Sequence, residues 1–421
     1  MSQYFLDDIQ TLDVTLRCHV GILRLNKVRY PPMSDSLNTY TVIMLGPRGS
    51  GKTVYLASMY KKLSTQGRQG FFLEVDSAEK RKRLHNIYTQ IAIDEKWPKG
   101  TTYDEVSEWT FTCRVQTENL PIYSACRFKY LDYAGGRLTD EMEDEDTSFE
   151  SKLQTADALL GLLDGQRLKA LMRNEKLGLF WVVNELPNML NIMQSSQKPI
   201  HFVISKWDTL INEYSLEKLR DRLLGIEEFR NLIQARNEAR LPVRLIPISS
   251  VGMGFAELQP DGSMAKTGSL PNPFLVEMPL ACILPDMIKT TLEELIKKKQ
   301  EELSQPIEVK PNLSFWDRLG QVVGGVGKVG IGIVKQILPK KYMFSEDILE
   351  DFIDFLDDLE KPAQQKREAA ERRAEQLRCK QMESLKKVTD EETALKHAVN
   401  CFISLTDELE SKFPASNLKQ F

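Results

Sequence analysis

The stretch TVIMLGPRGSGKT, residues Thr41–Thr53, decides how the rest of this sequence is interpreted. Its first five residues form an unbroken and partly β-branched apolar run, which is typical of a strand buried on both faces of a parallel sheet. A glycine-rich turn follows at Gly46, and apolar residues then recur at helical spacing from Tyr55 to Leu63. The stretch therefore predicts a buried strand, a tight loop and a helix in direct succession.

The loop of this stretch matches the pattern GxxxxGK[ST] over residues 46–53. Glycines are needed in such a loop because the backbone must wrap closely around a phosphate with its N–H groups pointing inward. The ammonium group of Lys52 is expected to neutralise the β- and γ-phosphates, and the hydroxyl of Thr53 to bind Mg²⁺. The loop residues predicted to bind a nucleotide are Gly46, Gly49, Ser50, Gly51, Lys52 and Thr53.

Strand-like apolar runs alternate with helical stretches along the next 250 residues. The further strand candidates are Trp109–Val115, Ala125–Leu131, Ala156–Leu163, Ile200–Ile204 and Val243–Ile248. Leu216–Ala239 has the pattern of one charged amphipathic helix, and Pro273–Leu303 that of a closing helix interrupted near Pro285. This alternation predicts an α/β fold, a three-layer sandwich with a mostly parallel sheet and helices on both faces.

The composition is that of an ordinary globular protein. Of 421 residues, 42% are hydrophobic and 28% are charged, which excludes a disordered, collagen-like or multi-span membrane protein. Fifty-six Lys and Arg against 60 Asp and Glu leave a net charge of −4, so no nucleic-acid partner is expected. The six cysteines lie far apart without metal-ligand spacing, and the N-terminal residues lack a signal-peptide pattern. A reducing cytoplasm fits both features.

Three regions are distinguished by their composition. Residues 1–38 form a lead segment that contains Pro31-Pro32, and residues 39–305 form the α/β domain. After residue 306 the sequence becomes a Gly- and Val-rich segment followed by charged amphipathic stretches, so we expect a C-terminal helical domain over residues 306–421.

A second motif with chemical meaning is Asp132-Tyr133-Ala134-Gly135, which closes the strand candidate before it with the pattern DxxG. In chain order after a phosphate loop, Asp132 is placed to hold Mg²⁺ through a water, and the amide of Gly135 to sense the γ-phosphate. The alternative interpretation is an ordinary turn after a strand.

A third motif, Ser205-Lys206-Trp207-Asp208, follows the buried run Ile200–Ile204 and matches [NT]KxD except at Ser205. A carboxylate at Asp208 can accept hydrogen bonds from guanine N1–H and the 2-amino group, a pair that adenine lacks. The stem of Lys206 is expected to lie across the base. The alternative is a solvated Lys/Asp pair.

A fourth, more degenerate motif is Ser249-Ser250 in PISSVG, which ends the last predicted strand. A loop of small residues there can present a backbone N–H to the guanine carbonyl oxygen. It supports the other three motifs.

With these four motifs in order, residues 39–305 resemble a Ras-like P-loop GTPase domain of the translation-factor-related class. The tail and the long stretches between motifs resemble bacterial double-GTPase proteins of conflict systems. The resemblance implies GTP or GDP and Mg²⁺ as cofactors, and a GTP-hydrolysing conformational switch. It gives Asp132, Lys206, Asp208 and Ser250 the roles described above.

Three departures from the family pattern matter for catalysis. The Mg²⁺-binding threonine of the first switch has two candidates, Thr101 and Thr102, and either can be an ordinary loop residue. Gly136 stands where the family often has a water-orienting Gln, so intrinsic hydrolysis is expected to be slow without a partner. Arg48 and Arg137 are candidates for a cis arginine that stabilises transition-state charge, against the plainer interpretation of exposed salt-bridging arginines.

The Gly- and Val-rich segment Phe315–Leu338 is too interrupted by polar residues to span a membrane. We expect it to pack against the GTPase domain or another subunit, with peripheral membrane contact as the alternative because basic residues flank it. The helical tail is thus the expected surface for a protein partner or self-association. Two other functions stay open: a nucleotide-binding scaffold with negligible hydrolysis, favoured by Gly136, and an ATPase, favoured by Ser205.

Overall fold

The computed structural model describes residues 37–94, 97–98, 107–133, 147–259, 264–302, 317–319, 331–332, 334–335, 346–359, 376 and 378–418. Leu37–Phe421 form one compact unit. The predicted lead segment, residues 1–38, lies almost wholly outside the described residues.

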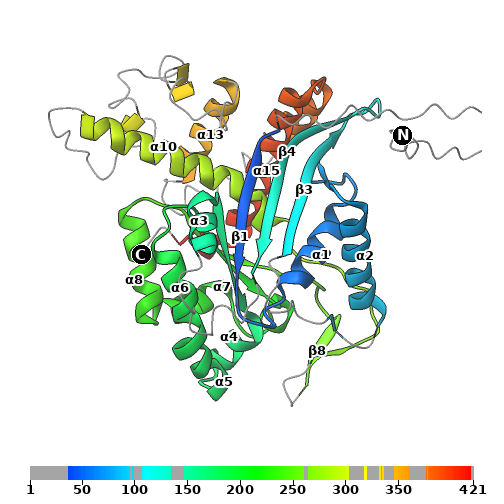
Figure 1. Cartoon of the computed structure of the whole chain (residues 1–421), viewed down its shortest axis with the longest axis vertical. Helices are drawn as coiled ribbons and strands as arrows, with labels where there is room; N and C mark the ends of the chain where they lie inside the picture. The colour runs from blue at the N-terminus through cyan, green and yellow to red at the C-terminus, as the bar shows by residue number, and fades with distance from the viewer. Residues whose placement is uncertain are drawn as a thin grey trace, which may run out of the picture. The chain divides into compact units, whose positions relative to one another are not determined.

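A seven-stranded sheet with the strand order β2-β3-β4-β1-β5-β6-β7 forms the centre of the fold (Figure 1). The strands are β1 (Thr39–Leu45), β2 (Phe72–Val75), β3 (Ser107–Gln116), β4 (Ile122–Asp132), β5 (Ala158–Asp164), β6 (Ile200–Ser205) and β7 (Val243–Pro247). From β4 to β7 all neighbours pair in parallel, whereas β3 pairs antiparallel with both β4 and β2. The predicted mostly parallel sheet is therefore confirmed. A small separate hairpin, β8 (Ala256–Leu258) and β9 (Met264–Lys266), was not predicted.

Strand β1 is buried on both faces, as its apolar run predicts. Val42 and Met44 belong to one hydrophobic core, and Ile43 and Leu45 to the other, because successive side chains of a strand point to opposite faces. All four side chains are at most 1% exposed. The sheet therefore separates two cores, which is the arrangement of a three-layer sandwich.

Helices cover both faces of the sheet (Figure 1). The core that includes Val42 is closed by α1 (Lys52–Leu63), α2 (Ala78–Ile93), α9 (Met278–Ala281), α10 (Ile283–Glu302), α13 (Glu346–Leu359) and α15 (Glu391–Lys412). The core that includes Ile43 is closed by α3 (Thr147–Thr155), α4 (Gly165–Met172), α6 (Leu186–Gln194), α7 (Leu216–Leu224) and α8 (Glu227–Glu238). These layers confirm the predicted α/β sandwich.

The helix predicted over Leu216–Ala239 is in fact two helices, α7 and α8. The N–H of Gly225 caps α7 by donating to the carbonyls of Asp221 and Arg222, and Ile226 is extended with φ −88° and ψ 124°. The extended residue separates the two helices and changes the direction of the chain between them, so each helix can bury its own apolar side. The closing helix is interrupted close to the expected place, because α9 ends at Ala281 and α10 begins at Ile283.

Helix α15 lies on the antiparallel part of the sheet, in contact with β4 and β3. The ring of Phe402 lies 5.8 Å from that of Phe128 and 5.0 Å from that of Phe71. A hairpin such as β3-β4 has no crossover helix to cover it, whereas parallel strands need one at every connection. An element from the end of the chain therefore covers this face. This part of the C-terminal region lies in the same compact unit as the sheet, and the domain boundary expected at residue 306 stays a prediction.

Most of the Gly- and Val-rich segment lies outside the described residues. Residues 331–332 and 334–335 are helical, and Ile331 and Val334 are buried in the core that α15 closes. Within the described ranges no helix is long and apolar enough to cross a bilayer.

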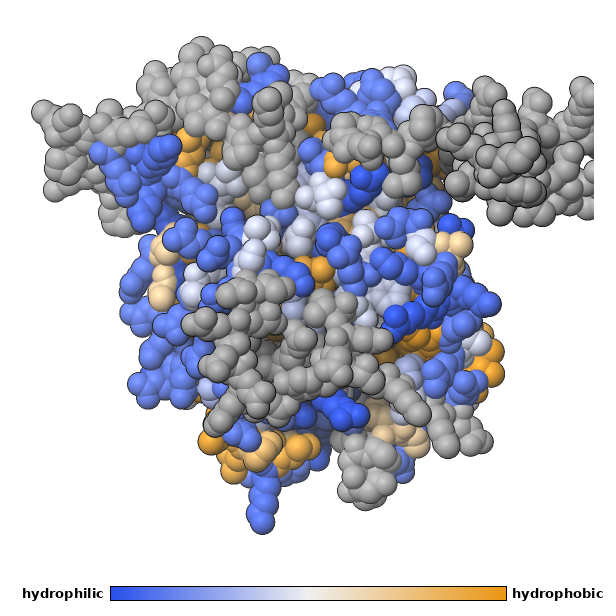
Figure 2. Space-filling view, viewed as in Figure 1, coloured by the Kyte–Doolittle hydropathy of each residue, from blue (hydrophilic) through white to orange (hydrophobic). Residues whose placement is uncertain are grey.

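One group of exposed apolar side chains stands out on α5 (Lys176–Phe180) and the π-helical turn η2 (Trp181–Glu185). Leu177, Phe180 and Val183 are 53%, 57% and 78% exposed. Figure 2 shows hydrophobic side chains at the lower edge of the molecule, where Figure 1 places α5. Trp181 of the same turn points inward and is 1% exposed.

Candidate functional site

The predicted motifs meet at one edge of the sheet. In the register of the strands, Met44 of β1 pairs with Asp132 of β4, and Asp164 of β5 pairs with Ser205 of β6. Because these strands are parallel, the loops that follow them leave the sheet on the same side, where open α/β sheets bind their ligands. The phosphate-loop motif, Asp132 and SKWD therefore all border one site.

The phosphate loop has the backbone that its glycines predict. Gly46 has φ +153°, and a Cβ there would lie 2.9 Å from Ser50 Oγ and 3.1 Å from Leu162 Cβ. Gly51 has φ +91° and precedes α1, whose first turn receives no side-chain cap. The backbone N–H groups and the positive end of the helix dipole at this turn suit a phosphate group.

Lys52, Thr53 and Asp132 lie together beneath this loop. The ammonium of Lys52 donates to the Gly46 carbonyl over 2.8 Å, and the Thr53 hydroxyl lies 3.5 Å from Asp132 Oδ2. Burial raises the pKa of Asp132 to about 6, against the opposing charge of Lys52. Burial likewise lowers the pKa of Lys52, which the carboxylate of Asp132 partly offsets. Two opposite charges thus lie buried together, with Lys52 7% and Asp132 1% exposed.

The side chains around Lys52 and Asp132 have the chemistry that suits a Mg²⁺ ion and phosphate groups. Ser50 Oγ and Asp132 Oδ1 are buried and have no hydrogen-bond partner among the described residues. A hydroxyl and a carboxylate are the hard oxygen donors that Mg²⁺ prefers, usually completed by phosphate oxygens and waters. In the described part of the chain, no three His, Cys, Asp or Glu side chains are grouped as a metal cage. Asp132 Oδ1 is thus free to bind a metal ion, and the Thr53 hydroxyl lies 3.5 Å from the other oxygen of the same carboxylate, so Thr53 and Asp132 are the residues that would hold Mg²⁺.

Lys206 is fixed in the loop after β6 by partners that sequence reasoning missed. Its backbone has φ +54°, and its ammonium donates to Asp164 Oδ2 and to Gln166 Oε1, each over 2.8 Å. Asp164 ends β5 and also caps α4 by accepting from the N–H of Gln166. An Asp-Gly pair after a buried run is a helix-start signal that could have pointed to it. The hydroxyl of Ser205 donates to the Leu163 carbonyl over 3.2 Å, so serine at this motif position ties β6 to β5.

Asp208 is oriented by the loop after β7. The Ser249 hydroxyl donates to Asp208 Oδ1 over 2.5 Å, and itself accepts from the N–H of Gly252 over 2.8 Å. The other oxygen, Oδ2, is buried with no hydrogen-bond partner within the described ranges. Burial raises the pKa of Asp208, and the hydrogen bond from Ser249 opposes this shift. Ser250 lies next to it, half-buried in the same loop.

Several predicted catalytic residues lie outside the described residues. These are Thr101, Thr102, Gly135, Gly136 and Arg137. Arg48 is described and is exposed in the phosphate loop. The structure therefore brings together the predicted phosphate, metal and base ligands, while the switch residues stay predictions.

No protein-family model matches the chain, and no curated protein matches it. Among solved structures, the chain is similar to the small GTPase Arl6 BBS3 from Trypanosoma brucei with bound GppNp, at 12% identity and a TM-score of 0.25 over 50% of this chain and 87% of that one. It is also similar to the signal recognition particle receptor SRb-GTP/SRX complex from Chaetomium thermophilum, at 14% identity and a TM-score of 0.30 over 51% of this chain and 92% of that one. The translation-factor-related class and the conflict-system likeness stay predictions.

Proposed function

We propose that this chain binds GTP and GDP with Mg²⁺ and hydrolyses GTP as a conformational switch. The observation that carries the proposal is the geometry of Asp208. One carboxylate oxygen is fixed by Ser249, and the other is buried without a partner among the described residues. A buried acceptor of this kind favours a base that donates hydrogen bonds and penalises one that does not. Guanine offers two donors at this edge, and adenine offers none.

The phosphate end of the site has matching chemistry. Lys52 would neutralise the β- and γ-phosphates, aided by the N–H groups at the start of α1. Thr53 and Asp132 would hold Mg²⁺, which when bound neutralises charge on the phosphate oxygens. Arg48, exposed in the loop, is the described candidate for a cis arginine.

The switch part of the proposal links the nucleotide to the C-terminal helix. Contacts of the γ-phosphate to the segments of Thr101, Thr102 and Gly135 would order them, and hydrolysis would release them. Helix α15 packs on β4, the strand that ends at Asp132, so a change after Asp132 has a neighbouring element to act on. We propose this helical region as the surface for a protein partner, with slow hydrolysis until that partner supplies the group that Gly136 lacks.

The test is a competition titration of GTP, ATP and XTP in the presence of Mg²⁺. Wild type is expected to prefer GTP over ATP by roughly a hundredfold or more, because a buried acceptor left unpaired rejects the wrong base. Asp208→Asn exchanges an acceptor for a donor and should shift the preference toward XTP. Asp221→Asn, the same exchange at an exposed carboxylate of α7, is the matched control. Equal affinities for GTP and ATP in wild type would refute guanine recognition and leave a nucleotide binder without base selectivity, and a preference for ATP would favour an ATPase.

The second candidate function is a nucleotide-binding scaffold with negligible hydrolysis. It is favoured by Gly136, which has no side chain to orient water. Multiple-turnover phosphate release, measured with and without lipid vesicles or candidate protein partners, separates the two functions. Guanine selectivity without release in any condition would support the scaffold and overturn the hydrolytic part of the proposal.

A further inference from the structure

The residues that follow α15 lie beside the base-recognition loop. The ring of Phe413 meets that of Trp207 edge-on, with ring centres 6.1 Å apart and planes at 86°. Trp207 stands between Lys206 and Asp208 and is 1% exposed. Edge-to-face aromatic pairs at this separation are attractive and orientation-dependent. Phe413 therefore restrains the residue next to the carboxylate that faces the base.

Phe413 also reaches the second loop of the site through Phe274. These two rings are 6.4 Å apart with planes at 81°. The backbone of Phe274 exchanges two hydrogen bonds with Ser249, of 3.0 Å and 2.8 Å. Because Ser249 donates to Asp208, a single side chain contacts both elements that hold this carboxylate.

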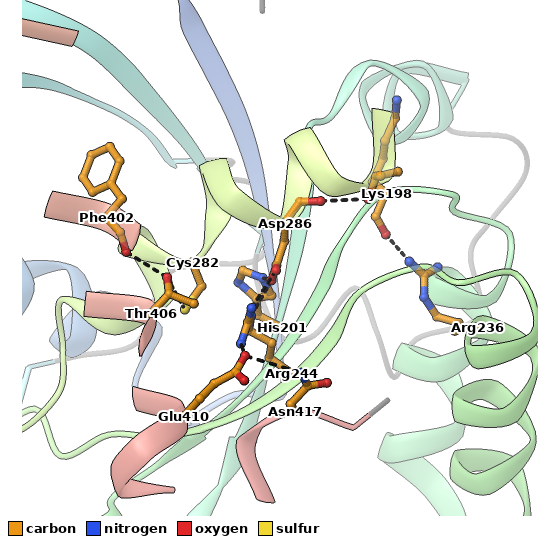
Figure 3. A network of polar contacts seen from close by, with 11 residues as sticks. Lys198, His201, Arg236, Arg244, Cys282, Asp286, Phe402, Thr406, Glu410 and Asn417 are labelled. Atoms are coloured by element: carbon orange, nitrogen blue, oxygen red, sulfur yellow. Dashed lines mark hydrogen bonds and ion pairs between the residues drawn. The ribbon is translucent and has the colours of Figure 1, made fainter. Parts of the chain in front are cut away.

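The segment around Phe413 is itself firmly anchored at the opposite end of β7. Glu410 accepts from Arg244 over 2.6 Å, and Asn417 forms a β-bridge with Arg244 (Figure 3). The N–H of Leu418 donates to the Val243 carbonyl over 3.1 Å, and the Leu418 side chain is fully buried. Phe413 thus lies between a fixed tail and the two recognition loops.

We propose that Phe413 is a positioning residue for guanine recognition, which holds the loops of Trp207 and Ser249 so that Asp208 meets the base. This inference rests on the proposed guanine-nucleotide binding. It assigns the tail Phe413–Leu418 the task of bracing the base site rather than only closing the core. Displacement of this tail would release bound guanine nucleotide.

The experiment compares the affinities of GDP and ADP, measured with Mg²⁺ by competition against a fluorescent guanine nucleotide, in wild type and Phe413→Ala. The variant should bind GDP about tenfold more weakly, a loss equal to one aromatic pair, and ADP unchanged. Phe402→Ala is the matched control, since Phe402 lies on α15 and makes similar edge-on contacts with Phe71 and Phe128 instead. It should leave the ratio of GDP to ADP affinity as in wild type.

The possible outcomes separate the two proposals. Equal GDP and ADP affinities in wild type would defeat the guanine assignment itself. A ratio of GDP to ADP affinity that is unchanged in Phe413→Ala, or that falls equally in Phe402→Ala, would overturn the positioning role alone. Phe413→Tyr keeps the ring and should retain the wild-type ratio. If Phe413→Ala does not fold, Phe413→Leu keeps an apolar group without the ring edge, and an unchanged ratio in that variant would also overturn the role.

Discussion

The two ends of the parallel strands β6 and β7 treat buried carboxylates in opposite ways. At the carboxyl ends, Asp208 Oδ2 is buried with no hydrogen-bond partner among the described residues. Asp132 Oδ1, at the end of β4, likewise has no hydrogen-bond partner among them. At the amino ends, His201 and Arg244 both bond to the carboxylate of Asp286 (Figure 3). A buried acceptor without a partner is costly unless a ligand supplies one. The comparison therefore marks the first end as a binding site and the second as a structural joint.

The joint is a closely paired ionic network. Asp286 accepts from His201 Nε2 over 2.8 Å and from two nitrogens of Arg244 over 2.5 and 2.8 Å. Burial alone would raise the pKa of Asp286, but the Arg244 guanidinium and His201 hold it well below its usual range. A third nitrogen of Arg244 donates to Glu410. The network thus ties β6, β7, α10 and α15 into one body.

The largest expected effect comes from breaking this joint with Asp286→Ala. The variant leaves the fully buried guanidinium of Arg244 short of its main counter-charge, which costs about 3–5 kcal/mol. Urea denaturation should show this loss in the free energy of unfolding. Asp221→Ala, at an exposed carboxylate, is the control and should change stability little. A loss below about 1 kcal/mol for Asp286→Ala would contradict the structural role of the joint.

Lys52→Ala should give the opposite signature at the binding end. Removing a charge-assisted contact to phosphate costs about 1.5–3 kcal/mol of binding, which weakens GTP roughly 10- to 100-fold. The free energy of unfolding should fall less than in Asp286→Ala, because the carboxyl of Asp132, whose pKa is already raised to about 6, can take up a proton when its counter-charge is lost. Titration of GTP and urea denaturation of one preparation measure both quantities. Lys61→Ala, at an exposed lysine of α1, should leave both unchanged, and a loss of stability in Lys52→Ala as large as that in Asp286→Ala would argue against this division of roles.

The smallest expected effect is a pH dependence from His397 on α15. Its Nδ1 lies 2.8 Å from the Ser384 hydroxyl and its Nε2 lies 3.0 Å from the Gly70 carbonyl. Burial lowers the pKa of His397, against the opposing Gly70 carbonyl. The unfolded chain therefore takes up the proton first, and stability falls as the pH drops through the ordinary histidine value of about 6.5.

This pH effect can be measured by urea denaturation at about pH 7.5 and about pH 5.5. His397→Gln should remove part of the difference between the two conditions while keeping a polar side chain in place. The same pH difference in wild type and variant would show that His397 does not contribute to it.

Much of the fold could be predicted because the parallel strands are continuous apolar runs. The apolar run that contains Val42 and Met44 predicts a strand from the local pattern alone. Strand β2 was not predicted from the sequence, because Phe72–Val75 is only four residues long and lies at the sheet edge. The break between α7 and α8 was not predicted, because the pattern of charged and apolar residues continues on both sides of Gly225.

The site divides in the same way between local and distant information. The phosphate loop is one continuous motif, and Asp132 and Asp208 each belong to a motif of four consecutive residues. The sequence alone therefore predicts their chemistry. The partnership of Lys206 with Asp164 joins residues 42 positions apart, and no motif records it. The packing of Phe413 on Trp207 depends on where α15 ends in space. Such contacts follow from tertiary packing rather than from a pattern of neighbouring residues.

The placement of α15 has a consequence for how the chain reaches this structure. The hydrogen bond between His397 and the Gly70 carbonyl joins residues 327 positions apart, and the same helix covers Phe71 and Phe128. Contacts of such long range slow folding, because a large loop must close before they form. During synthesis the β3-β4 hairpin emerges long before its cover, with its apolar face open to water. Nascent chains that do not yet include α15 should therefore be prone to aggregation and dependent on chaperones.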